Sequence, residues 1–406
     1  MAIEKGNAVH ESQSKPVVPR DIDPSKLKMT LSPSLSPIPP PTSLKFGEQH
    51  TDHMLVISYD PKTGWSDPEI KPYGNFEIDP MSSCFQYATN CFEGMKAYLG
   101  PNSHPLLFRP TMNMARLTSS VNRLSLPSFS TTAFLSLIKT LVLTEKRWIP
   151  RDPAGNALTG YSLYVRPTMI GTKSSLGVGP SDKAILYVIC SPTGPFFPLE
   201  TGLGNVPGYI KPVSLLAVSE HVRAWPGGTG AHKLALNYSP GFLTQKDASE
   251  KGYDQILWLR KEGEEEIIME VGAMNFFVAV KRDDGDIDII TPPLDGTILP
   301  GVTRASILEL AKSDSSLFST KLHPSESQLT TAQLKQWSSS GKLLEIFGVG
   351  TAAIVAPIAL IGFQQGEKIT VPEYEQGIGP VASAIRTRIL DIQEGRIEWD
   401  GWAVPC

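Results

Sequence analysis

One lysine of this 406-residue chain lies in a setting that suits nucleophilic chemistry. Lys233 follows the glycine-rich stretch RAWPGGTGAH and precedes three apolar residues, Leu234, Ala235 and Leu236. Apolar surroundings disfavour the ammonium form of a lysine and leave a nucleophilic amine. The alternative is an ordinary surface lysine in a loop, so the other segments of the chain must decide between the two.

Two glycine-containing segments are candidate anion sites. LDGTILPGVTRASILEL places Val302 and Thr303 where a loop enters a predicted helix, so backbone N–H groups and the helix dipole would face a phosphate. FGVGTAAIV repeats this pattern with Thr351 and Ala352. Ordinary helix capping explains either segment alone. Together with a nucleophilic lysine they indicate pyridoxal phosphate, whose aldehyde takes the amine and whose phosphate needs such a cradle.

That cofactor requires an acid opposite its ring nitrogen, because the protonated pyridine is the electron sink. Glu270 lies within an otherwise apolar predicted strand, IIMEVGAMNFF. An unpaired carboxylate there would be costly, so we expect a cationic partner for it. The alternative is a glutamate that faces water at the end of a strand.

The composition excludes several classes of protein. Lys and Arg number 37 and Asp and Glu 41, which gives a net charge of −4, and no long run of like charges occurs. A nucleic-acid binder or a polybasic membrane-surface protein needs a concentrated positive field, so neither partner is expected. The four cysteines lack C-x-x-C spacing, and we expect reduced thiols and no metal site.

The length and the composition shifts predict two domains. Residues 1–45 contain eight prolines and seven serines and read as an extended, mobile arm. We expect a small N-terminal domain at 46–195, an interdomain linker at 196–212, where proline and glycine are dense, and a large domain at 213–406. Strands and helices do not alternate strictly, which favours an α+β fold over a doubly wound sheet.

Local patterns predict individual elements and the compartment. Strands are expected at 53–60, at FEIDP and at the β-rich runs of both domains, and helices at MNMARLTSSVNRL, AFLSLIKTLVLTEKRWI, ASILELAK and VASAIRTRILDIQ. FEGMKA is expected to be a short helix. The apolar run 343–363 contains Glu345 and Pro357, so a strand, a turn and a helix start are favoured over a membrane span. The N-terminus lacks an apolar signal stretch and carries early acids, which favours the cytoplasm, with mitochondria as the alternative.

Eight collinear motifs, from about Phe46 to about Gln393, resemble those of the branched-chain amino acid aminotransferases, which are fold-type IV pyridoxal-phosphate enzymes. The motifs are FEGMKAY, LFRPTMNMARL, SLYVRPTMIGT, RAWPGGTGAHKLALNY, DQILWL, EVGAMNFF, TPPLDGTILPGVTR and FGVGTAA. The resemblance implies the two-domain α+β fold of D-amino acid aminotransferase, with a smaller N-terminal α/β domain and a larger C-terminal domain that binds pyridoxal 5'-phosphate. It also implies a homodimer with composite sites.

The resemblance assigns roles to individual residues. Lys233 would bind the cofactor covalently and then move the proton of the substrate Cα. Glu270 would pair with the pyridinium nitrogen, and Tyr238 would donate a hydrogen bond to the phenolic oxygen. The phosphate would be held by Arg109 in LFRP, by backbone N–H groups of Val302 and Thr303, and by Thr351. A structural salt bridge is the alternative for Arg109.

The implied substrate pocket has aromatic and aliphatic walls, which reward the burial of apolar side chains. Its residues would be Tyr87, Phe92, Tyr164 and Tyr238, although Phe92 and Tyr164 could instead be core aromatics. Arg166 in YVRP resembles the arginine that lets the same pocket accept the second carboxylate of glutamate. Leu176, Gly177 and Val178 match a loop that reaches over from the partner subunit.

The chain also departs from the family pattern. The family commonly has EVGTMN, whose threonine assists the substrate carboxylate, whereas this chain has Ala273 and must rely on Ala352 and neighbouring backbone groups. Ala235 and Leu236 replace two glycines after the lysine. We predict a transaminase that interconverts Leu, Ile and Val with their 2-oxo acids and uses 2-oxoglutarate and glutamate as the second pair. The alternatives are a same-fold enzyme with another substrate, such as a D-amino acid or secondary-metabolism transaminase or an aminodeoxychorismate-lyase-like enzyme, and a non-catalytic paralogue.

Overall fold

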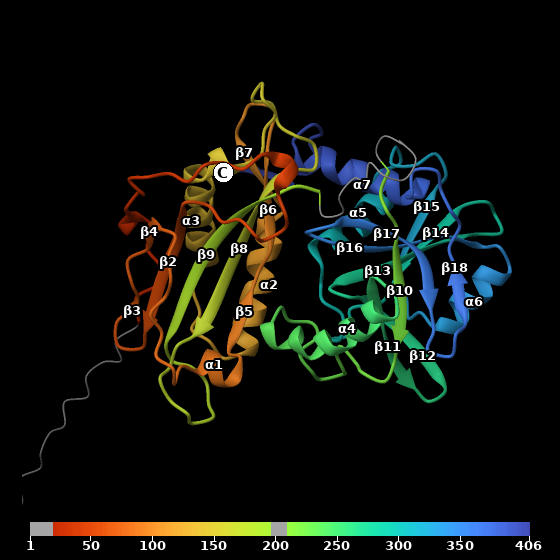
Figure 1. Cartoon of the computed structure of the whole chain (residues 1–406), viewed down its shortest axis with the longest axis horizontal. Coiled ribbons are helices and arrows are strands. Elements are labelled where there is room, and N and C mark those ends of the chain that lie inside the picture. The colour runs from red at the N-terminus through yellow and green to blue at the C-terminus, as the bar shows by residue number, and fades with distance from the viewer. Residues whose placement is uncertain (1–18, 196–208) are drawn as a thin grey trace, which may run out of the picture.

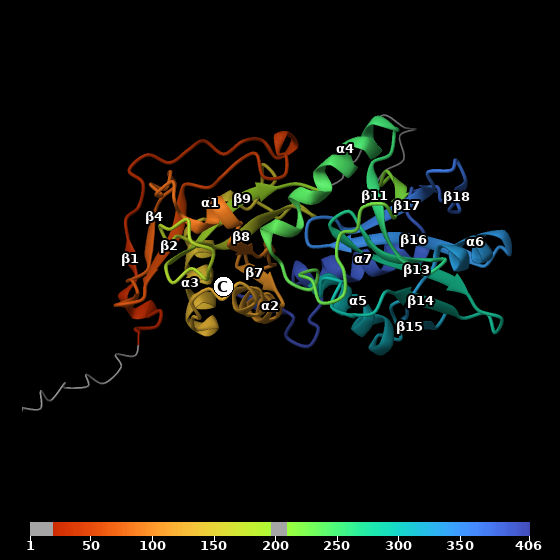
Figure 2. The ribbon, with the colours of Figure 1, turned by 90° about the horizontal axis from the view of Figure 1, so that it is seen from below.

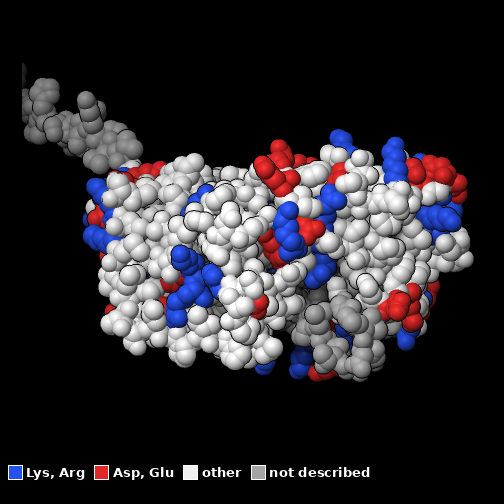
Figure 3. Space-filling view, turned by 90° about the horizontal axis from the view of Figure 1, so that it is seen from above, with Lys and Arg blue, Asp and Glu red and all other residues white. Residues whose placement is uncertain are grey.

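The computed structural model describes residues 19–195 and 209–406, which form two sheets that lie side by side with helices packed on them (Figure 1). Within these ranges, no helix has both the length and the apolar character needed to cross a bilayer. On the face drawn in Figure 3, basic and acidic side chains are interspersed, and much of the surface is uncharged. The α+β class predicted from the sequence is confirmed.

The first sheet has ten strands and belongs mainly to the N-terminal half. Its main path is β1 (Lys28–Met29), β4 (Glu69–Pro72), β2 (His53–Asp60), β9 (Ala184–Thr193), β8 (Ser162–Gly171), β6 (Met95–Leu99), β7 (Pro105–Phe108) and β19 (Ala403–Pro405). The short strands β3 (Gly64–Trp65) and β5 (Asn90–Phe92) pair with β2 and β8. The longest ladder joins β8 and β9 in antiparallel register, with Tyr164 opposite Ser191. This ladder forms the centre of the sheet.

Helices α2 (Pro110–Arg123) and α3 (Thr131–Thr144) lie on one side of this sheet (Figure 2), and the short helix α1 (Ser83–Tyr87) precedes β5. Helix α2 begins with a proline at its first position, which suits a helix N-terminus. Its residues Met114, Leu117 and Val121 recur at helical spacing and are buried in the first core. Ser130 caps α3 by accepting a hydrogen bond from the N–H of Ala133.

The second sheet has nine strands. Its main path is β12 (Glu265–Val271), β11 (Gln255–Glu262), β10 (Val213–Val218), β17 (Ile354–Gly362), β16 (Leu343–Gly350), β13 (Met274–Lys281), β14 (Ile287–Thr291) and β15 (Leu322–Glu326), and β18 (Lys368–Thr370) pairs with β17. The helices of this half are α4 (Phe242–Glu250), α5 (Val302–Ser313), α6 (Thr331–Ser339) and α7 (Pro380–Gln393). The core beneath α5 and α7 also takes in Tyr98 and Phe108 from the first sheet, so the two halves share apolar contacts.

The C-terminus returns to the first sheet, where β19 pairs antiparallel with β7 (Figure 1). Lys139 of α3 also donates a hydrogen bond to the carbonyl of Pro405. The large domain predicted at 213–406 therefore contributes its last residues to the sheet of the small domain. Most of the predicted linker, 196–208, lies outside the described residues.

Four expectations from the sequence need correction. Residues 19–45 are not a mobile arm: β1 pairs with β4, and Ile22 is buried in the first core. Residues 1–18 lie outside the described residues. FEIDP forms no strand, and the expected helix at FEGMKA is replaced by strand β6, which β7 and β8 flank on both sides. The apolar run 343–363 forms the hairpin β16–β17 and contains no helix start.

Candidate active site

A cavity of about 400 Å³ lies between the two halves of the molecule. The first half contributes mainly aromatic and basic side chains, and the second half contributes a lysine, a carboxylate and two backbone turns. The residues that line it include Phe46, Phe92, Gly94, Arg116, Tyr164, Arg166, Lys233, Tyr238, Glu270, Ala273, Asn275, Gly301, Val302, Thr303, Thr351 and Ala352. The structure thus brings most of the predicted site residues together.

Lys233 is held in the cavity through its backbone. Its N–H donates to Ser120 Oγ at 2.9 Å, and its carbonyl accepts from the N–H of Phe92 at 3.2 Å. Its Nζ lies 3.1 Å from the hydroxyl of Tyr238 and 4.9 Å from the centre of the Phe92 ring. The amine is therefore half-buried against two aromatic rings, with one hydroxyl within hydrogen-bond distance.

Glu270 lies in β12 and is buried. Its Oε1 accepts hydrogen bonds from Asn275 Nδ2 at 2.8 Å and from the N–H of Leu299 at 3.3 Å. Arg223 Nε lies 2.7 Å from Oε2 and is the expected cationic partner, yet Oε2 accepts no hydrogen bond in suitable geometry from the described residues. Burial raises the pKa of Glu270, and Arg223 and Lys233 oppose this effect. Oε2 is thus a buried acceptor still able to take a proton donor.

Two backbone segments could bind an anion in this cavity. Gly301 is the N-cap of the twelve-residue helix α5, so the N–H groups of Val302 and Thr303 belong to its first turn. A Cβ on Gly301 would lie 2.1 Å from Asn275 Oδ1, so any other residue would displace the Asn275 side chain from its hydrogen bonds to Glu270 and Leu299. Thr351 and Ala352 lie in the turn between β16 and β17, not at the helix start predicted from the sequence. The cavity therefore has one helix N-terminus and one hairpin turn.

The role predicted for Arg109 does not fit its position. Arg109 precedes α2 in the left-handed conformation, with φ of 44°, and does not line the cavity. Its guanidinium donates to Ser306 Oγ at 3.1 Å, pairs with Glu309 at 2.9 Å and lies 4.0 Å above the Trp402 ring. The geometry supports the structural salt bridge that the sequence left as the alternative.

Arg116, two turns further along α2, is the arginine of this motif that lines the cavity. It forms a buried ion pair with Glu93, and Asn113 donates to the same carboxylate at 2.8 Å. Sequence reasoning missed Arg116. The sequence indicates only that Asn113, Arg116 and Ser120 share one helical face. The folded structure shows that this face meets Lys233, because Ser120 contacts the backbone of Lys233.

The predicted pocket residues Phe92, Tyr164 and Arg166 lie together on one wall of the cavity. Arg166 Nη2 donates to the Tyr164 hydroxyl at 3.1 Å, and its guanidinium lies 4.8 Å above the Phe92 ring. Phe46, which the sequence placed only at a domain boundary, packs edge-on against Tyr164 with 4.8 Å between ring centres. Arg166 Nε is buried without a hydrogen-bond partner among the described residues.

Two alanines line the cavity from the second half of the molecule, and a lysine outside the cavity holds one of them. Ala273 and Ala352 line the cavity as predicted, and neither offers a side-chain hydroxyl. Lys96, which sequence reasoning missed, reaches from β6 and donates from Nζ to the carbonyl of Ala352 at 2.8 Å. Burial, aided by nearby Arg386, lowers the pKa of Lys96 to about 7. Lys96 therefore holds the β16–β17 turn from the opposite half of the molecule.

Tyr87, Leu176 and Val178 do not line the cavity of their own chain. The Tyr87 hydroxyl donates to the carbonyl of Leu176 at 2.5 Å, and Leu176 and Val178 are 58% and 89% exposed. The pocket role predicted for Tyr87 is therefore not supported within one chain. Leu176 and Val178 were expected to reach the site of a partner subunit, and their exposure is compatible with that expectation.

The comparisons with known proteins agree with this site. Residues 90–361 match the model of the amino-transferase class IV family. The mitochondrial branched-chain-amino-acid aminotransferase of Schizosaccharomyces pombe is 45% identical over 96% of this chain and 86% of its own length. The cytosolic one of Saccharomyces cerevisiae is 44% identical over 94% of this chain and 97% of its own length.

Solved structures share the fold at lower identity. The branched-chain aminotransferase of Thermoproteus uzoniensis with norvaline superposes with a TM-score of 0.65 at 21% identity, over 87% of this chain and 99% of that one. The pyridoxal-phosphate form from Thermobaculum terrenum gives 0.61 at 19% identity, over 88% and 99%. The cavity, the family model and the close relatives together place the chain in the branched-chain-amino-acid aminotransferases of the class IV family.

Proposed function

We propose that this chain is a pyridoxal-phosphate-dependent transaminase that interconverts leucine, isoleucine and valine with their 2-oxo acids and uses 2-oxoglutarate and glutamate as the second pair. One observation carries the proposal: the Lys233 amine, the Glu270 carboxylate and the N-terminus of α5 all face a single cavity. The names of the close relatives support the substrate class. The chain's own residues account for the chemistry as follows.

The residues of the cavity fit pyridoxal phosphate. Glu270 Oε2 is buried beside Arg223 Nε but accepts no hydrogen bond in suitable geometry from the described residues, which suits a protonated ring nitrogen. The N–H groups of Val302 and Thr303, the Thr351 hydroxyl and the guanidinium of Arg116 would hold the phosphate. When bound, the cofactor supplies an electron sink for the substrate Cα.

Lys233 is the residue that we assign to proton transfer. Its Nζ accepts the proton from the substrate Cα and returns a proton in the reverse half-reaction. The Tyr238 hydroxyl, 3.1 Å away, and the Phe92 ring limit where that amine can point. The backbone bonds of Lys233 to Ser120 and Phe92 hold the Cα of the lysine while its side chain moves.

The side-chain pocket suits both substrate classes. Phe46, Phe92 and Tyr164 offer apolar surface, and each CH₂ buried there contributes about 0.8 kcal/mol. Arg166 offers the charge for the second carboxylate of glutamate, and its unpartnered Nε–H is available for that purpose. Backbone groups at Thr351 and Ala352 are assigned to the α-carboxylate, since Ala273 has no hydroxyl.

A homodimer is part of the proposal. Large apolar side chains are exposed near one another in the first half of the chain, at Met81, Phe85, Tyr87, Leu176 and Val178. The contact between Tyr87 and Leu176 and the bridge between Ser82 and Ser174 join the two segments that carry them. Exposed apolar groups gathered in this way are typical of an interface, and a second copy of the chain would cover them. Light scattering on the purified protein tests this stoichiometry.

The test of the proposed function is Lys233→Ala, compared with Lys246→Ala as a control at an exposed lysine of α4. We expect Lys233→Ala to fold and to lose the half-reaction with leucine, because the proton-transferring amine is absent, while Lys246→Ala keeps wild-type rates. In the wild type, borohydride treatment with the cofactor should leave a pyridoxyl group on Lys233. Turnover of Lys233→Ala within tenfold of wild type would refute the assignment. A panel of amino donors with 2-oxoglutarate then separates branched-chain substrates from other amino acids.

A further inference from the structure

A loop at the edge of the first half carries Phe46 to the cavity and is closed at its base by polar contacts. The N–H of Ser36 donates to Asp52 Oδ1 at 2.8 Å, which joins two residues sixteen positions apart. Arg147 bridges the same two ends, because its Nη2 donates both to the carbonyl of Ser36 and to Asp52 Oδ2. Phe46 lies between these ends, with its ring 4.8 Å from that of Tyr164. The segment 36–52 is therefore a closed loop with a cavity residue on it.

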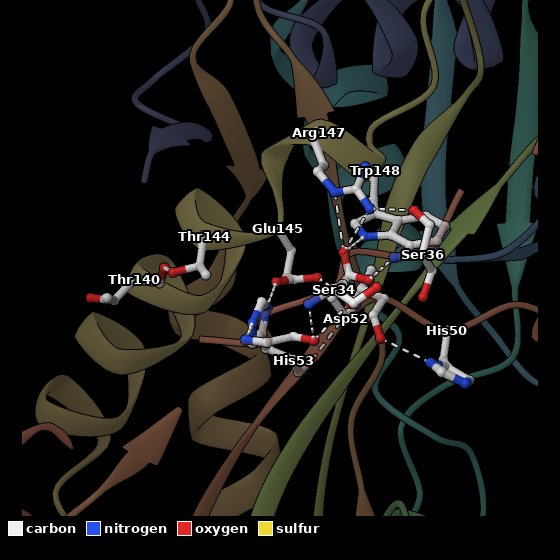
Figure 4. A network of polar contacts seen from close by, with 12 residues as sticks. Ser34, Ser36, His50, Asp52, His53, Thr140, Thr144, Glu145, Arg147 and Trp148 are labelled. Atoms are coloured by element: carbon white, nitrogen blue, oxygen red, sulfur yellow. Dashed lines mark hydrogen bonds and ion pairs between the residues drawn. The ribbon is translucent and has the colours of Figure 1, made fainter. Parts of the chain in front are cut away.

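A second pair of side chains extends these contacts (Figure 4). His53 Nδ1 lies 2.5 Å from Glu145 Oε1, and His53 Nε2 accepts the N–H of Ser32 at 2.8 Å. Since a backbone N–H can only donate, the ring proton of His53 lies on Nδ1 and is donated to Glu145. Glu145 Oε2 accepts the N–H of Asp52 at 2.8 Å, which links this pair to the base of the loop.

The side chains of Asp52, His53 and Glu145 are buried, and their hydrogen bonds are made to other residues of the chain. Asp52, His53 and Glu145 are only 7%, 3% and 1% exposed. Burial opposes the ionisation of Asp52, but hydrogen bonds from the Ser36 N–H, Trp148 and Arg147 lower its pKa to about 2. None of these network residues lines the cavity. Their partners are the two ends of the loop, so their effect on the site must act through the loop.

Prolines and a hydrogen bond restrain both ends of the loop. Pro37, Pro39, Pro40 and Pro41 follow Ser36, and each proline fixes its own φ. Residues 41–43 form a 3₁₀ turn, and Thr51 is held by a hydrogen bond from its N–H to the carbonyl of Cys190. The prolines restrict the first part of the loop and the Thr51 hydrogen bond anchors its end, so the contacts at the base limit where the loop can carry Phe46.

We propose that Asp52 and Arg147, supported by His53 and Glu145, are positioning residues that hold Phe46 as a wall of the substrate side-chain pocket and thereby set the preference for branched side chains. The proposal rests on the proposed function and adds to it a set of residues remote from the cavity. Loss of the base contacts releases Phe46, so large apolar substrates lose a wall while small ones lose little.

The test compares Arg147→Met, Phe46→Ala and the double variant, with Arg151→Met as the control. Arg147 is a third exposed, so its replacement removes the bridge without leaving a cavity in the core. We expect Arg147→Met to lower the ratio of kcat/KM for leucine over alanine at least fivefold, as Phe46→Ala does. In the Phe46→Ala background Arg147→Met should then have no further effect, because both changes remove the same wall. Arg151→Met should behave as the wild type.

Hydrogen exchange gives a readout that does not depend on activity. The hydrogen-bonded amides of the loop, which include those of Ser36, Ser43, Leu44 and Thr51, should exchange at least tenfold faster in Arg147→Met, with strands β8 and β9 unchanged. Equal losses of Arg147→Met in the wild-type and Phe46→Ala backgrounds would overturn the proposal, and so would unaltered exchange of the loop. Absence of leucine turnover in the wild type would refute the proposed function instead, and exchange alone would then decide whether Arg147 closes the loop.

Discussion

Arg116 and Glu93 form a bidentate ion pair at the wall of the cavity, with Nε 2.7 Å from Oε1 and Nη2 2.8 Å from Oε2. Arg116 Nη1 also donates to the carbonyl of Pro300, just before α5. These bonds use three of the five N–H groups of the guanidinium, and two remain for a ligand. Glu93 thus orients Arg116 toward the same place as the first turn of α5.

This geometry predicts that only one of the two arginines of LFRPTMNMARL matters for cofactor affinity. Arg116→Lys keeps a cation beside the buried Glu93 but loses the fork that binds phosphate oxygens in pairs, so cofactor affinity should fall at least tenfold. Arg109→Gln should leave cofactor affinity within twofold of wild type, because Arg109 contacts Glu309 and Trp402 outside the cavity. Titration of the apoenzyme with pyridoxal phosphate measures both affinities. If Arg109→Gln weakened cofactor binding and Arg116→Lys did not, Arg109 would be the phosphate-binding residue.

Glu270→Gln should impair chemistry more than cofactor binding. Asn275 and the N–H of Leu299 both donate to Oε1, so the amide oxygen of glutamine takes that place and its NH₂ group replaces Oε2. A donor would then face Arg223 and the ring nitrogen, where an acceptor is needed. We expect the leucine half-reaction to slow about 100-fold, or about 3 kcal/mol, in single-turnover measurements. If cofactor affinity falls while the rate holds, Glu270 has only a structural role.

Sequence patterns located the parts of the site that are local along the chain. Lys233 and Tyr238 are five residues apart, and Val302 and Thr303 follow their own N-cap, so a short motif is enough to place them. The choice between Arg109 and Arg116 was not local, because it depends on which side of α2 faces the second half of the molecule. Both arginines belong to one motif, and only the packing of α2 separates them.

Two other errors have similar causes. An apolar run such as 343–363 has no period that separates a buried strand from a buried helix, and pairing with β13 and β10 settles it as a hairpin. Phe46 was missed because the sequence marked it only as the boundary between the proline-rich segment 1–45 and the small domain. Its position depends on Asp52 and Arg147, which lie 95 residues apart and meet only in the folded protein.

Glu345 predicts a pH dependence of stability. Its oxygens accept the N–H groups of Val381 and Ala382 at the start of α7, and burial still raises its pKa from 4.5 to about 6. The folded state then binds the proton more tightly than the unfolded state. The contribution of Glu345 to the free energy of unfolding is therefore lost as the pH rises through 4.5 to 6. This difference of about 1.5 between the pKa values of the folded and unfolded states corresponds to about 2 kcal/mol of stability.

Denaturant unfolding of wild type and Glu345→Gln at pH 4.5 and pH 7 measures this effect. Because glutamine does not titrate, the stability of wild type relative to Glu345→Gln should fall by about 2 kcal/mol between the two values of pH. A pH-independent difference would show that the helix N-terminus fully offsets the burial of the carboxylate.

The same pocket must accept the apolar side chain of leucine and then the second carboxylate of glutamate, and Arg166 is the residue that we assign to the carboxylate. Its Nη2 donates a hydrogen bond to the Tyr164 hydroxyl, and its guanidinium lies over the Phe92 ring. Its Nε has no hydrogen-bond partner among the described residues. Leucine leaves these contacts in place, and glutamate would satisfy the free N–H. Arg166→Met should therefore raise KM for 2-oxoglutarate and glutamate at least tenfold, about 1.4 kcal/mol, while the leucine half-reaction changes less than threefold.

Tyr164→Phe is the matched control for Arg166, since it removes only the hydroxyl that accepts from Nη2 and keeps the apolar ring. We expect a smaller rise in KM for glutamate than with Arg166→Met, because the charge remains but is less well oriented. Steady-state kinetics with each amino donor give both values. Equal losses for leucine and glutamate in Arg166→Met would mean that this guanidinium supports the wall formed by Phe92 and Tyr164, and another group would then have to bind the second carboxylate.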